Sequence, residues 1–248
     1  GAHFVAFEAD QGDGRPWAAT SIGLYRLDPA TPALQPVAIP GQPAPNLRSL
    51  AVARDGTLWL GTRDAGLLHF DPRNGVVAQV PYLDGDPRGL AHPTVHAVLV
   101  ARDGRVWIGT GHGLDVYDPA RRQLHHYHQL PDAPGGLAGN LVRALWEAPD
   151  DSLWVGSHGG LNHVTFDASG TPRFTQPLAD REPDAPQPVV FSLAMDRAGE
   201  LWMGTDRGLL RYAPRTGTVR RYGPGDGLQG PEFNGGAVAT LRDGRLAF

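Results

Sequence analysis

The stretch DGTLWLGTRDAGLLHFDP, residues 55–72, decides the fold because it contains a turn, a strand, a second turn and a second strand. Its Asp55-Gly56 pair supplies the positive φ angles that a tight hairpin needs. The residues that follow, TLWLGT, are typical of a strand, and Gly66 with Leu67 marks the turn into the next strand. One such stretch therefore predicts the centre of an antiparallel sheet.

Closely related stretches recur along the chain: DGRVWIGTGHGLDVYDP from Asp103, DSLWVGSHGGLNHV from Asp151 and GELWMGTDRGLLRY from Gly199. Five of the six tryptophans share one place in the pattern, with spacings of 42, 48, 47 and 48 residues: Trp17, Trp59, Trp107, Trp154 and Trp202. A sixth copy begins at RDGRLAF, residues 242–248. Periods in the forties fit a propeller blade and exceed the helical repeats of about 33 or 34 residues.

Each repeat reads as four strands. In residues 94–130, TVHAVLV alternates in period two, RVWIGT and LDVYDP follow after short turns, and LHHYHQL is the fourth segment. We predict an all-β fold, a β-propeller of four-stranded antiparallel blades with five complete blades and the start of a sixth. The blades are expected at about 3–47, 48–93, 94–140, 141–188 and 189–235, with a partial blade at 236–248, in a single partial propeller domain spanning 1–248.

The motif residues have structural explanations. The tryptophan is large enough to fill the space between neighbouring sheets, and the glycine two residues later permits a close approach of backbone or ring. These glycines are Gly61, Gly109, Gly156 and Gly204. Two copies depart from the pattern: the first has Ala18-Ala19-Thr20 where others have Gly-Thr or Gly-Ser, and the fourth has Ser152 where a hairpin glycine is expected. The turn geometry of these two copies is therefore open.

The pattern D-x-x-G-x-L-W-x-G-T-x-x-G-L-x-x-Y/F-D-P resembles the two-component regulator propeller repeat, found in periplasmic sensor regions of bacterial histidine kinases and some diguanylate cyclases. Residues 227–248 resemble the last blades before the three-Tyr domain of these receptors. The resemblance implies two seven-bladed propellers outside the membrane, a linker domain, a transmembrane helix and a cytoplasmic output domain. Here we expect part of the second propeller, either as an open arc whose edge a second copy covers or as a piece of a longer ring.

Composition narrows the function classes. The formal net charge of −4 leaves no basic footprint for nucleic acid. The absence of Cys excludes thiolate chemistry and Cys-ligated metals. No apolar run approaches the roughly 18 residues of a membrane span. The start, GAHFVAFEAD, has no pattern of a signal peptide. The resemblance implies a periplasmic location, as the extracytoplasmic part of an inner-membrane protein.

Function is expected where the copies differ, in the loops between second and third strands, because loops on a rigid scaffold carry binding residues. We predict ligand contacts by six loop residues: Arg63, Asp64, His112, His158, Asp206 and Arg207. The two histidines are the alternative metal ligands, together with Asp64 or Asp206. We assign no catalytic residue, no metal and no cofactor.

Three further motifs are interpreted as structural. LHHYHQL, residues 124–130, alternates its histidines between two strand faces and is expected to be an outer fourth strand. GDGLQG, residues 225–230, lacks the helix that a phosphate cradle needs. LDGDPRG, residues 83–89, lacks the later ligands of a calcium loop and is read as an interblade loop.

The sequence favours a ligand-sensing propeller module of a bacterial transmembrane receptor that is not itself catalytic. Its expected partners are an unknown small-molecule or carbohydrate ligand, the neighbouring propeller and linker domains of the same receptor, and a second receptor copy in a homodimer, with no nucleic acid. The alternative is a propeller enzyme of the streptogramin-lyase-like or glycan-cleaving type, which needs clustered catalytic or metal-binding groups. A third reading, a protein-interaction scaffold, requires a broad exposed apolar patch.

Overall fold

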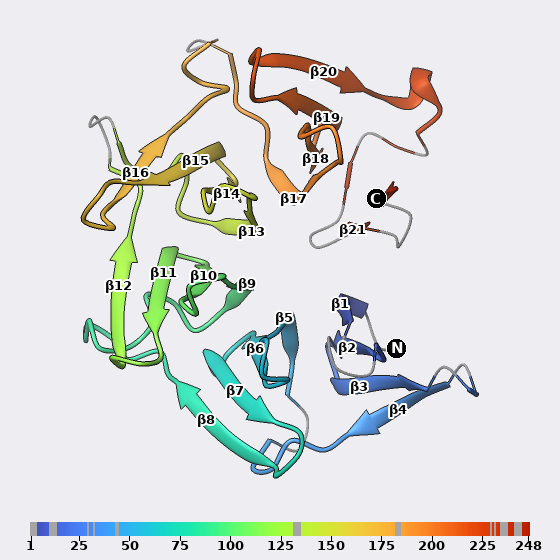
Figure 1. Ribbon diagram of the computed structural model, residues 1–248, viewed down its shortest axis with the longest axis vertical. Coiled ribbons are helices and arrows are strands. Elements are labelled where there is room, and N and C mark those ends of the chain that lie inside the picture. Colours follow the sequence, from blue (N-terminus) through green and yellow to red (C-terminus); the bar gives the residue numbers. More distant parts are fainter. Residues whose placement is uncertain are drawn as a thin grey trace. The chain divides into compact units, whose positions relative to one another are not determined.

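Antiparallel sheets make up the computed structural model, which describes residues 4–9, 14–28, 30–31, 33–42, 45–130, 135–181, 185–228, 230, 232–233, 238–240 and 245–248. These residues form five four-stranded sheets, here called blades 1 to 5, and one two-stranded sheet (Figure 1). Each blade pairs its four strands in sequence order. The predicted all-β fold with four-stranded antiparallel blades is confirmed.

The strands of the blades follow the repeat. Blade 1 contains β1 (Phe4–Ala9), β2 (Pro16–Thr20), β3 (Gly23–Asp28) and β4 (Ala33–Val37). Blade 2 contains β5 (Leu47–Val52), β6 (Leu58–Thr62), β7 (Leu67–Asp71) and β8 (Val76–Val80). Blade 3 contains β9 (Val95–Val100), β10 (Val106–Thr110), β11 (Gly113–Asp118) and β12 (Gln123–Tyr127).

The remaining strands repeat the same order. Blade 4 contains β13 (Val142–Glu147), β14 (Leu153–Ser157), β15 (Gly160–Phe166) and β16 (Pro172–Thr175). Blade 5 contains β17 (Val190–Met195), β18 (Leu201–Thr205), β19 (Gly208–Ala213) and β20 (Thr218–Tyr222). The two-stranded sheet pairs β21 (Ala239–Thr240) with β22 (Leu246–Ala247). In the described part of the chain the only helical segment is the short η1 (Pro224–Asp226), and no helix there is long and apolar enough to cross a membrane.

The chain divides into two compact units, Gly1–His126 and Tyr127–Phe248. Blades 1 to 3 belong to the first unit, apart from the last residue of β12, and blades 4 and 5 belong to the second. The single propeller domain over 1–248 and its blade boundaries stay a prediction.

The cores lie between successive blades within each unit. In the first unit, Trp59 packs with Leu90, Val95 and Ile108, so it joins blade 2 to blade 3. In the second unit, Trp154 packs with residues of both blade 4 and blade 5, and its ring centroid lies 5.8 Å from that of Tyr212. Burying a large apolar side chain contributes about 1.5–3 kcal/mol. Trp59 and Trp154 therefore fill the space between neighbouring sheets, as predicted.

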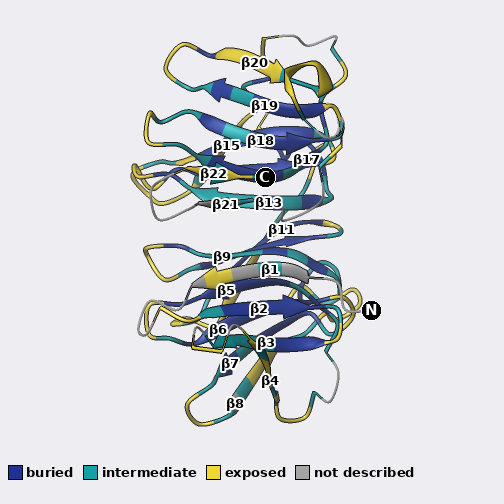
Figure 2. Cartoon of the chain, turned by 90° about the vertical axis from the view of Figure 1, so that its right-hand side faces the viewer, coloured by how far each residue is buried: buried dark blue, intermediate teal, exposed yellow. Residues whose placement is uncertain are grey.

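Burial decreases across a blade from the second strand to the fourth. All five residues of β6, β10 and β14 are buried, whereas four of the five residues of β20 are exposed. Figure 2 shows the same gradient in the second unit, where β18 is largely dark blue and β20 largely yellow. The fourth strand is the solvent-exposed edge of the blade. The first four residues of LHHYHQL, 124–127, lie on the fourth strand β12 as predicted, and residues 128–130 follow it.

The glycine two residues after the tryptophan allows the next blade to approach. A Cβ placed on Gly61 would lie 2.6 Å from Cγ1 of Val95, which begins the next blade. The same substitution at Gly156 would put a Cβ 2.5 Å from Cγ1 of Val190. No side chain fits at these distances, so the predicted close approach is confirmed at these two positions.

A hydroxyl that the sequence reasoning missed closes every turn between second and third strands. The last residue of each second strand is a buried Thr or Ser. Its hydroxyl donates to the carbonyl of the glycine that ends the turn, over 2.7–3.2 Å. The same hydroxyl accepts a hydrogen bond from a backbone N–H within the turn. These residues are Thr20, Thr62, Thr110, Ser157 and Thr205. The first copy therefore keeps the common turn despite its Ala18-Ala19-Thr20 sequence.

The hairpin of blade 4 corrects one prediction. Gly56 and Gly104 have φ angles of 81° and 86°, as the pattern requires, but the corresponding residue of blade 4 is Asp151, with φ 63°, and not Ser152. Ser152 instead donates its hydroxyl to Asp150 Oδ1 over 2.6 Å. Asp is one of the few residues that adopts the left-handed region at small cost. The Asp243-Gly244 turn predicted for the sixth copy lies outside the described residues.

Two blades place a histidine on the motif tryptophan. The ring of His69 stacks on Trp59 with centroids 4.0 Å apart, and the ring of His163 stacks on Trp154 at 4.2 Å. His69 Nε2 lies 2.9 Å from the hydroxyl of Thr57, which donates to Asp55. Desolvation lowers the pKa of both histidines and so favours their neutral rings.

Candidate ligand-binding site

The predicted loop residues of the first unit are exposed. Arg63 and Asp64 lie in the turn between β6 and β7, where the Arg63 carbonyl accepts a hydrogen bond from Thr94 Oγ1 over 2.6 Å. His112 lies in the turn between β10 and β11, and its backbone N–H donates to Thr110 Oγ1. Exposure is compatible with ligand contact, and a ligand role for these three residues stays a prediction.

In the second unit, His158 lies in the turn between β14 and β15. Its ring meets that of Phe191 edge to face, with centroids 6.2 Å apart. Partial desolvation lowers the pKa of His158, the positive charge of Arg143 lowers it further, and Asp206 opposes both effects. His158 therefore favours its neutral form. His112 belongs to the other unit, and a site shared by the two histidines stays a prediction.

Asp206 and Arg207 hold the backbone that leads into blade 5. The Asp206 carboxylate accepts a hydrogen bond from the Val189 N–H at 2.9 Å, and the Arg207 guanidinium donates to the Pro186 carbonyl at 3.0 Å. Arg207 Nε also lies 3.5 Å from the Asp206 carboxylate. Both side chains thus position the segment that precedes β17. Within the described ranges, no group of three or more His, Asp or Glu side chains is arranged to hold a metal ion.

The segments that join one blade to the next, here called connectors, differ in how they are fixed. They run from the fourth strand of one blade to the first strand of the following blade: residues 81–94 before blade 3, 128–141 before blade 4 and 176–189 before blade 5. Each connector packs beside one position of the third strand, namely the cross-strand partner of the residue after the motif tryptophan. That position holds Asp115 in blade 3, Asn162 in blade 4 and Leu210 in blade 5.

Asp115 fixes the connector before blade 3. This carboxylate is fully buried, accepts a hydrogen bond from the Ala91 N–H at 2.8 Å, and lies 2.7 Å from His126 Nδ1 on the fourth strand. The other ring nitrogen of His126 lies 2.9 Å from the Pro87 carbonyl. Both nitrogens of His126 therefore face acceptors, and the hydrogen bond to Asp115 raises the pKa of this histidine.

Asn162 fixes the connector before blade 4 in the same way. Its side-chain oxygen accepts a hydrogen bond from the Ala138 N–H at 2.7 Å, and its amide donates to the Gly136 and Thr175 carbonyls at 3.2 Å. Asn162 is fully buried. A neutral amide thus takes the place that a carboxylate occupies in blade 3.

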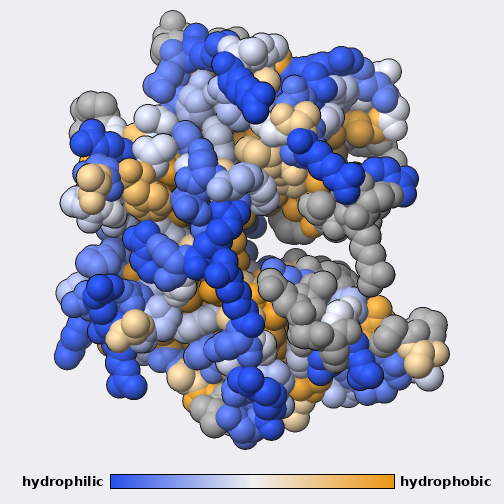
Figure 3. Space-filling model, viewed as in Figure 1, coloured by the Kyte–Doolittle hydropathy of each residue, from blue (hydrophilic) through white to orange (hydrophobic). Residues whose placement is uncertain are grey.

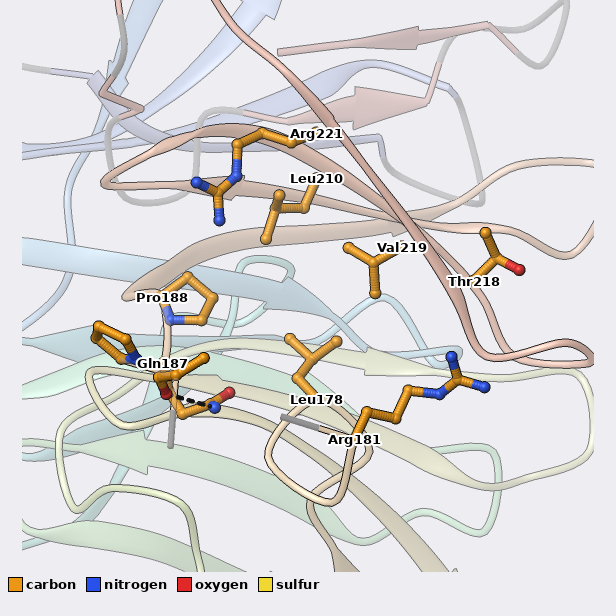
Figure 4. A pocket seen from close by; sticks show the side chains of 10 residues that line it. Leu178, Arg181, Gln187, Pro188, Leu210, Thr218, Val219 and Arg221 are labelled. Atoms are coloured by element: carbon orange, nitrogen blue, oxygen red, sulfur yellow. Dashed lines mark hydrogen bonds between the residues drawn. The ribbon is translucent and has the colours of Figure 1, made fainter. Parts of the chain in front are cut away.

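Blade 5 has no polar group at this position, and a cavity opens there. Leu210 faces the connector, and its partner on the fourth strand is Arg221. The cavity has a volume of about 450 Å³. Its apolar lining includes Leu178, Pro188, Leu210 and Val219. In the view of Figure 4, the guanidinium groups of Arg221 and Arg181 lie at opposite sides of these apolar side chains. The volume is in the range of small-molecule sites, and the lining combines apolar surface with positive charge.

The exposed surface offers few other apolar contacts. Hydrophilic side chains cover much of the face seen in Figure 3. The large apolar side chains that are exposed in the described part of the chain come from separate turns and strands: Ile22, Tyr82, Leu83, Leu130 and Val219. Val219 lines the cavity of blade 5. The cavity is therefore the candidate site that we carry forward.

These sheets and their repeated motif define a β-propeller of the kind built from tandem sequence repeats. Two segments, residues 89–112 and 184–207, match the family model described as "Two component regulator propeller". Each segment covers the end of a connector and the first two strands of a blade, in blades 3 and 5. The two matched segments are the repeat that the residue pattern resembles.

Solved structures share the fold. The extracellular domain of BT3049, described as a hybrid two-component system of B. thetaiotaomicron, aligns at 21% identity with a TM-score of 0.72, over 98% of this chain and 32% of that one. The extracellular domain of BT4673 from the same organism, described as a one-component system, aligns at 18% identity and a TM-score of 0.63, over 98% of this chain and 36% of that one. The chain thus spans about a third of the length of these two extracellular domains.

Enzymes also share the fold. A catalytically inactive virginiamycin B lyase from Staphylococcus aureus aligns at 12% identity and a TM-score of 0.68, over 96% of this chain and 74% of that one. At such identities the likeness extends to the fold and not to the activity. A comparison with curated protein sequences finds no significant match.

Proposed function

We propose that the chain is an extracytoplasmic ligand-sensing propeller module of a bacterial transmembrane signalling receptor and is not itself catalytic. The observation that carries this proposal is the pair of two-component regulator propeller matches at residues 89–112 and 184–207. The likeness to extracellular domains of proteins described as two-component and one-component systems supports the same setting. The module acts in a periplasmic location, beside further propeller and linker domains, in a homodimeric receptor.

Signal transfer in this proposal requires a ligand that distinguishes two receptor states. A ligand shifts an equilibrium only by its difference in affinity for the two states. The cavity of blade 5 is suited to such a role because its lining comes from the connector at Pro188 and from the blade at Leu210 and Val219. A change in the packing of connector on blade is a movement that neighbouring domains can detect.

A receptor assay tests the signalling part of the proposal. The full-length receptor that contains this chain is expressed with a transcriptional reporter of its output, and small metabolites and oligosaccharides are screened. We expect one chemical class to change reporter output and to raise the melting temperature of the isolated chain. A phosphatase fusion at the C-terminus of this chain should be active only if the chain is exported. Cytoplasmic retention of the full-length protein would contradict the proposed location.

The enzyme alternative has its own measurement, since a lyase shares the fold. The chain is incubated with a streptogramin B antibiotic and with glycan oligosaccharides, and products are followed by mass spectrometry. We expect no turnover. Turnover that is lost on substitution of His158 by Gln, but retained on the same substitution of His125 in β12, would overturn the non-catalytic assignment.

A further inference from the structure

We infer that the cavity of blade 5 binds a small organic carboxylate, with the anionic group at Arg221 and an aliphatic body against Leu210 and Val219. The inference deepens the proposed function and rests on it for its role in signalling. It is carried by a comparison of three equivalent positions in blades 3, 4 and 5, two of which the protein closes with its own side chains.

In the connectors before blades 3 and 4, a buried leucine fills the space between connector and blade. Leu90 and Leu137 each stand five residues before the first strand of their blade, and each is 1% exposed. Five residues before β17 the chain has Ala185, which lines the cavity. Replacing a buried leucine by alanine removes three carbon atoms from a packed site and leaves a void when the surroundings do not collapse.

Blade 5 also lacks both the donor and the acceptor of the hydrogen bond that fixes the connector in blades 3 and 4. The donor residue of blades 3 and 4, Ala91 or Ala138, corresponds to Pro186, which has no backbone N–H. The acceptor, Asp115 or Asn162, corresponds to Leu210. Because donor and acceptor are lost together, no buried polar group is left unsatisfied. The connector before blade 5 thus leaves the cavity open without the free-energy cost of an unsatisfied buried polar group.

The fourth strand supplies the charge. In blade 3, His126 pairs with the carboxylate of Asp115. In blade 5 the strand residue opposite Leu210 is Arg221, whose exposed side chain makes no hydrogen bond or ion pair with any other residue that the structure describes. Arg181 donates one bond to the Thr216 carbonyl at 2.9 Å and lies on the other side of the cavity. Two guanidinium groups beside aliphatic side chains favour an anion with an apolar body.

A carboxylate is the anion that this comparison favours. The ligand would give Arg221 the partner that Asp115 gives His126, and arginine binds a planar carboxylate through two parallel hydrogen bonds. The aliphatic body would occupy the space that Leu90 and Leu137 fill in the other connectors. None of the described residues that line the cavity carries an aromatic ring on which a neutral sugar would stack.

Calorimetric titration of the chain with three probes that share one branched aliphatic body tests the inference: 4-methylpentanoate, its neutral amide and 3-methylbutyl phosphate. We expect the carboxylate to bind and the amide to bind about tenfold or more weakly, because a charge-assisted hydrogen bond is lost. The phosphate arm separates carboxylate recognition from general anion binding. Tighter binding of the phosphate would overturn the carboxylate assignment, and equal binding of acid and amide would overturn the anion site.

Matched variants locate the site. Arg221→Gln should weaken binding of the carboxylate about tenfold or more. Arg220→Gln, on the same strand, should leave binding within about twofold, because Arg220 lies over the Tyr222 ring and does not line the cavity. Ala185→Leu should abolish binding by refilling the space, with circular dichroism to confirm folding. Unchanged binding in both Arg221→Gln and Ala185→Leu would overturn the inference.

The receptor assay separates this inference from the proposed function. Reporter output that responds to a neutral compound, while the chain binds none of the anionic probes, would overturn the carboxylate site and leave the sensing proposal intact. Binding of the carboxylate in an enzyme that turns it over, or in a receptor whose output no ligand changes, would keep the site and overturn the sensing proposal.

Discussion

Blades 3 and 5 share one strand framework and treat their connectors in opposite ways. In blade 3 a buried carboxylate, Asp115, ties the connector to the blade through Ala91 and is balanced by His126. In blade 5 Leu210 and Pro186 stand at the corresponding positions, and a cavity of about 450 Å³ separates connector from blade. The contact that blades 3 and 4 make and blade 5 lacks therefore marks a candidate site in blade 5.

The largest expected effect comes from breaking the closed connector. Asp115→Leu leaves the Ala91 N–H and the His126 ring without their acceptor, so we expect a loss of about 3 kcal/mol in the free energy of unfolding of the first unit. Urea unfolding monitored by tryptophan fluorescence measures it. Asp64→Asn, in an exposed turn, is the control and should change stability by less than about 0.5 kcal/mol. Equal effects of the two variants would show that Asp115 does not fix the connector.

The next largest effect on stability is expected from the turn hydroxyl that blades 3 and 5 share. Thr110→Val in blade 3 and Thr205→Val in blade 5 each remove a buried hydroxyl that both donates to and accepts from the turn backbone, and each should cost about 2 kcal/mol. Thr165→Val, on the exposed side of β15, is the matched control. If only one of the two buried sites is sensitive, the turn hydroxyl is not a common element of the blades.

Closing blade 5 should change stability in the other direction. Ala185→Leu restores the side chain that Leu90 and Leu137 contribute elsewhere, and we expect a gain of about 1 kcal/mol from cavity filling. The free energy of unfolding of the second unit is the measurement. A loss of stability would mean that the connector before blade 5 cannot accept the leucine, and that the blades differ in backbone path as well as in side chains.

The smallest effect is a pH dependence confined to blade 3. The pKa of His126 is raised in the folded chain by its hydrogen bond to Asp115, so the stabilisation is fully present below the unfolded value of about 6.5 and is lost as pH rises through the folded pKa. The difference in unfolding free energy between the wild type and His126→Gln should therefore shrink above neutral pH. A constant difference between pH 5 and 9 would contradict an imidazolium at this site.

Two histidines of blades 2 and 4 make the pH dependence of stability run in the opposite direction. The comparison with His126→Gln is therefore needed. His69 and His163 have lowered pKa values because of desolvation, so they stabilise the fold as neutral rings above about pH 6.5 and lose that contribution as pH falls through their folded pKa. The pH profile of the wild type contains both slopes. Only the variant isolates the contribution of blade 3.

The framework of the blades was predictable from letters alone, because it depends on local chemistry repeated five times. The signals that reveal it are local: each Asp-Gly hairpin and each glycine before a third strand fixes the backbone of a few neighbouring residues. The spacing of the tryptophans shows that these signals repeat. The hairpin of blade 4 was misassigned because Asp151 adopts a conformation that the pattern reserves for glycine. The role of the Thr and Ser hydroxyls was missed although the residues were part of the quoted motif.

The cavity could not be predicted in the same way, because it depends on contacts between segments about 24 residues or more apart, such as Leu210 with the connector. A signal was present: the letters GLD, GLN and GLL begin the third strands of blades 3, 4 and 5. Comparison of these triplets would have singled out the polar position of blades 3 and 4, but not blade 5 in particular, because Leu68 of blade 2 is also a leucine at this position. Asp206 and Arg207 were predicted as ligand contacts because the turns differ between copies; both hold the backbone of the neighbouring connector, and their ligand role stays a prediction.

The buried hydroxyls at the turns have a consequence for the entropy of binding. Because Thr62, Thr110 and their counterparts already fix the turn backbone, a molecule that binds at a turn orders little of the protein. A molecule that binds in blade 5 contacts a connector that lacks the hydrogen bond to Asp or Asn found in blades 3 and 4, so we expect it to order more of the protein. The two kinds of binding should therefore differ in calorimetry, with the larger entropic cost at blade 5.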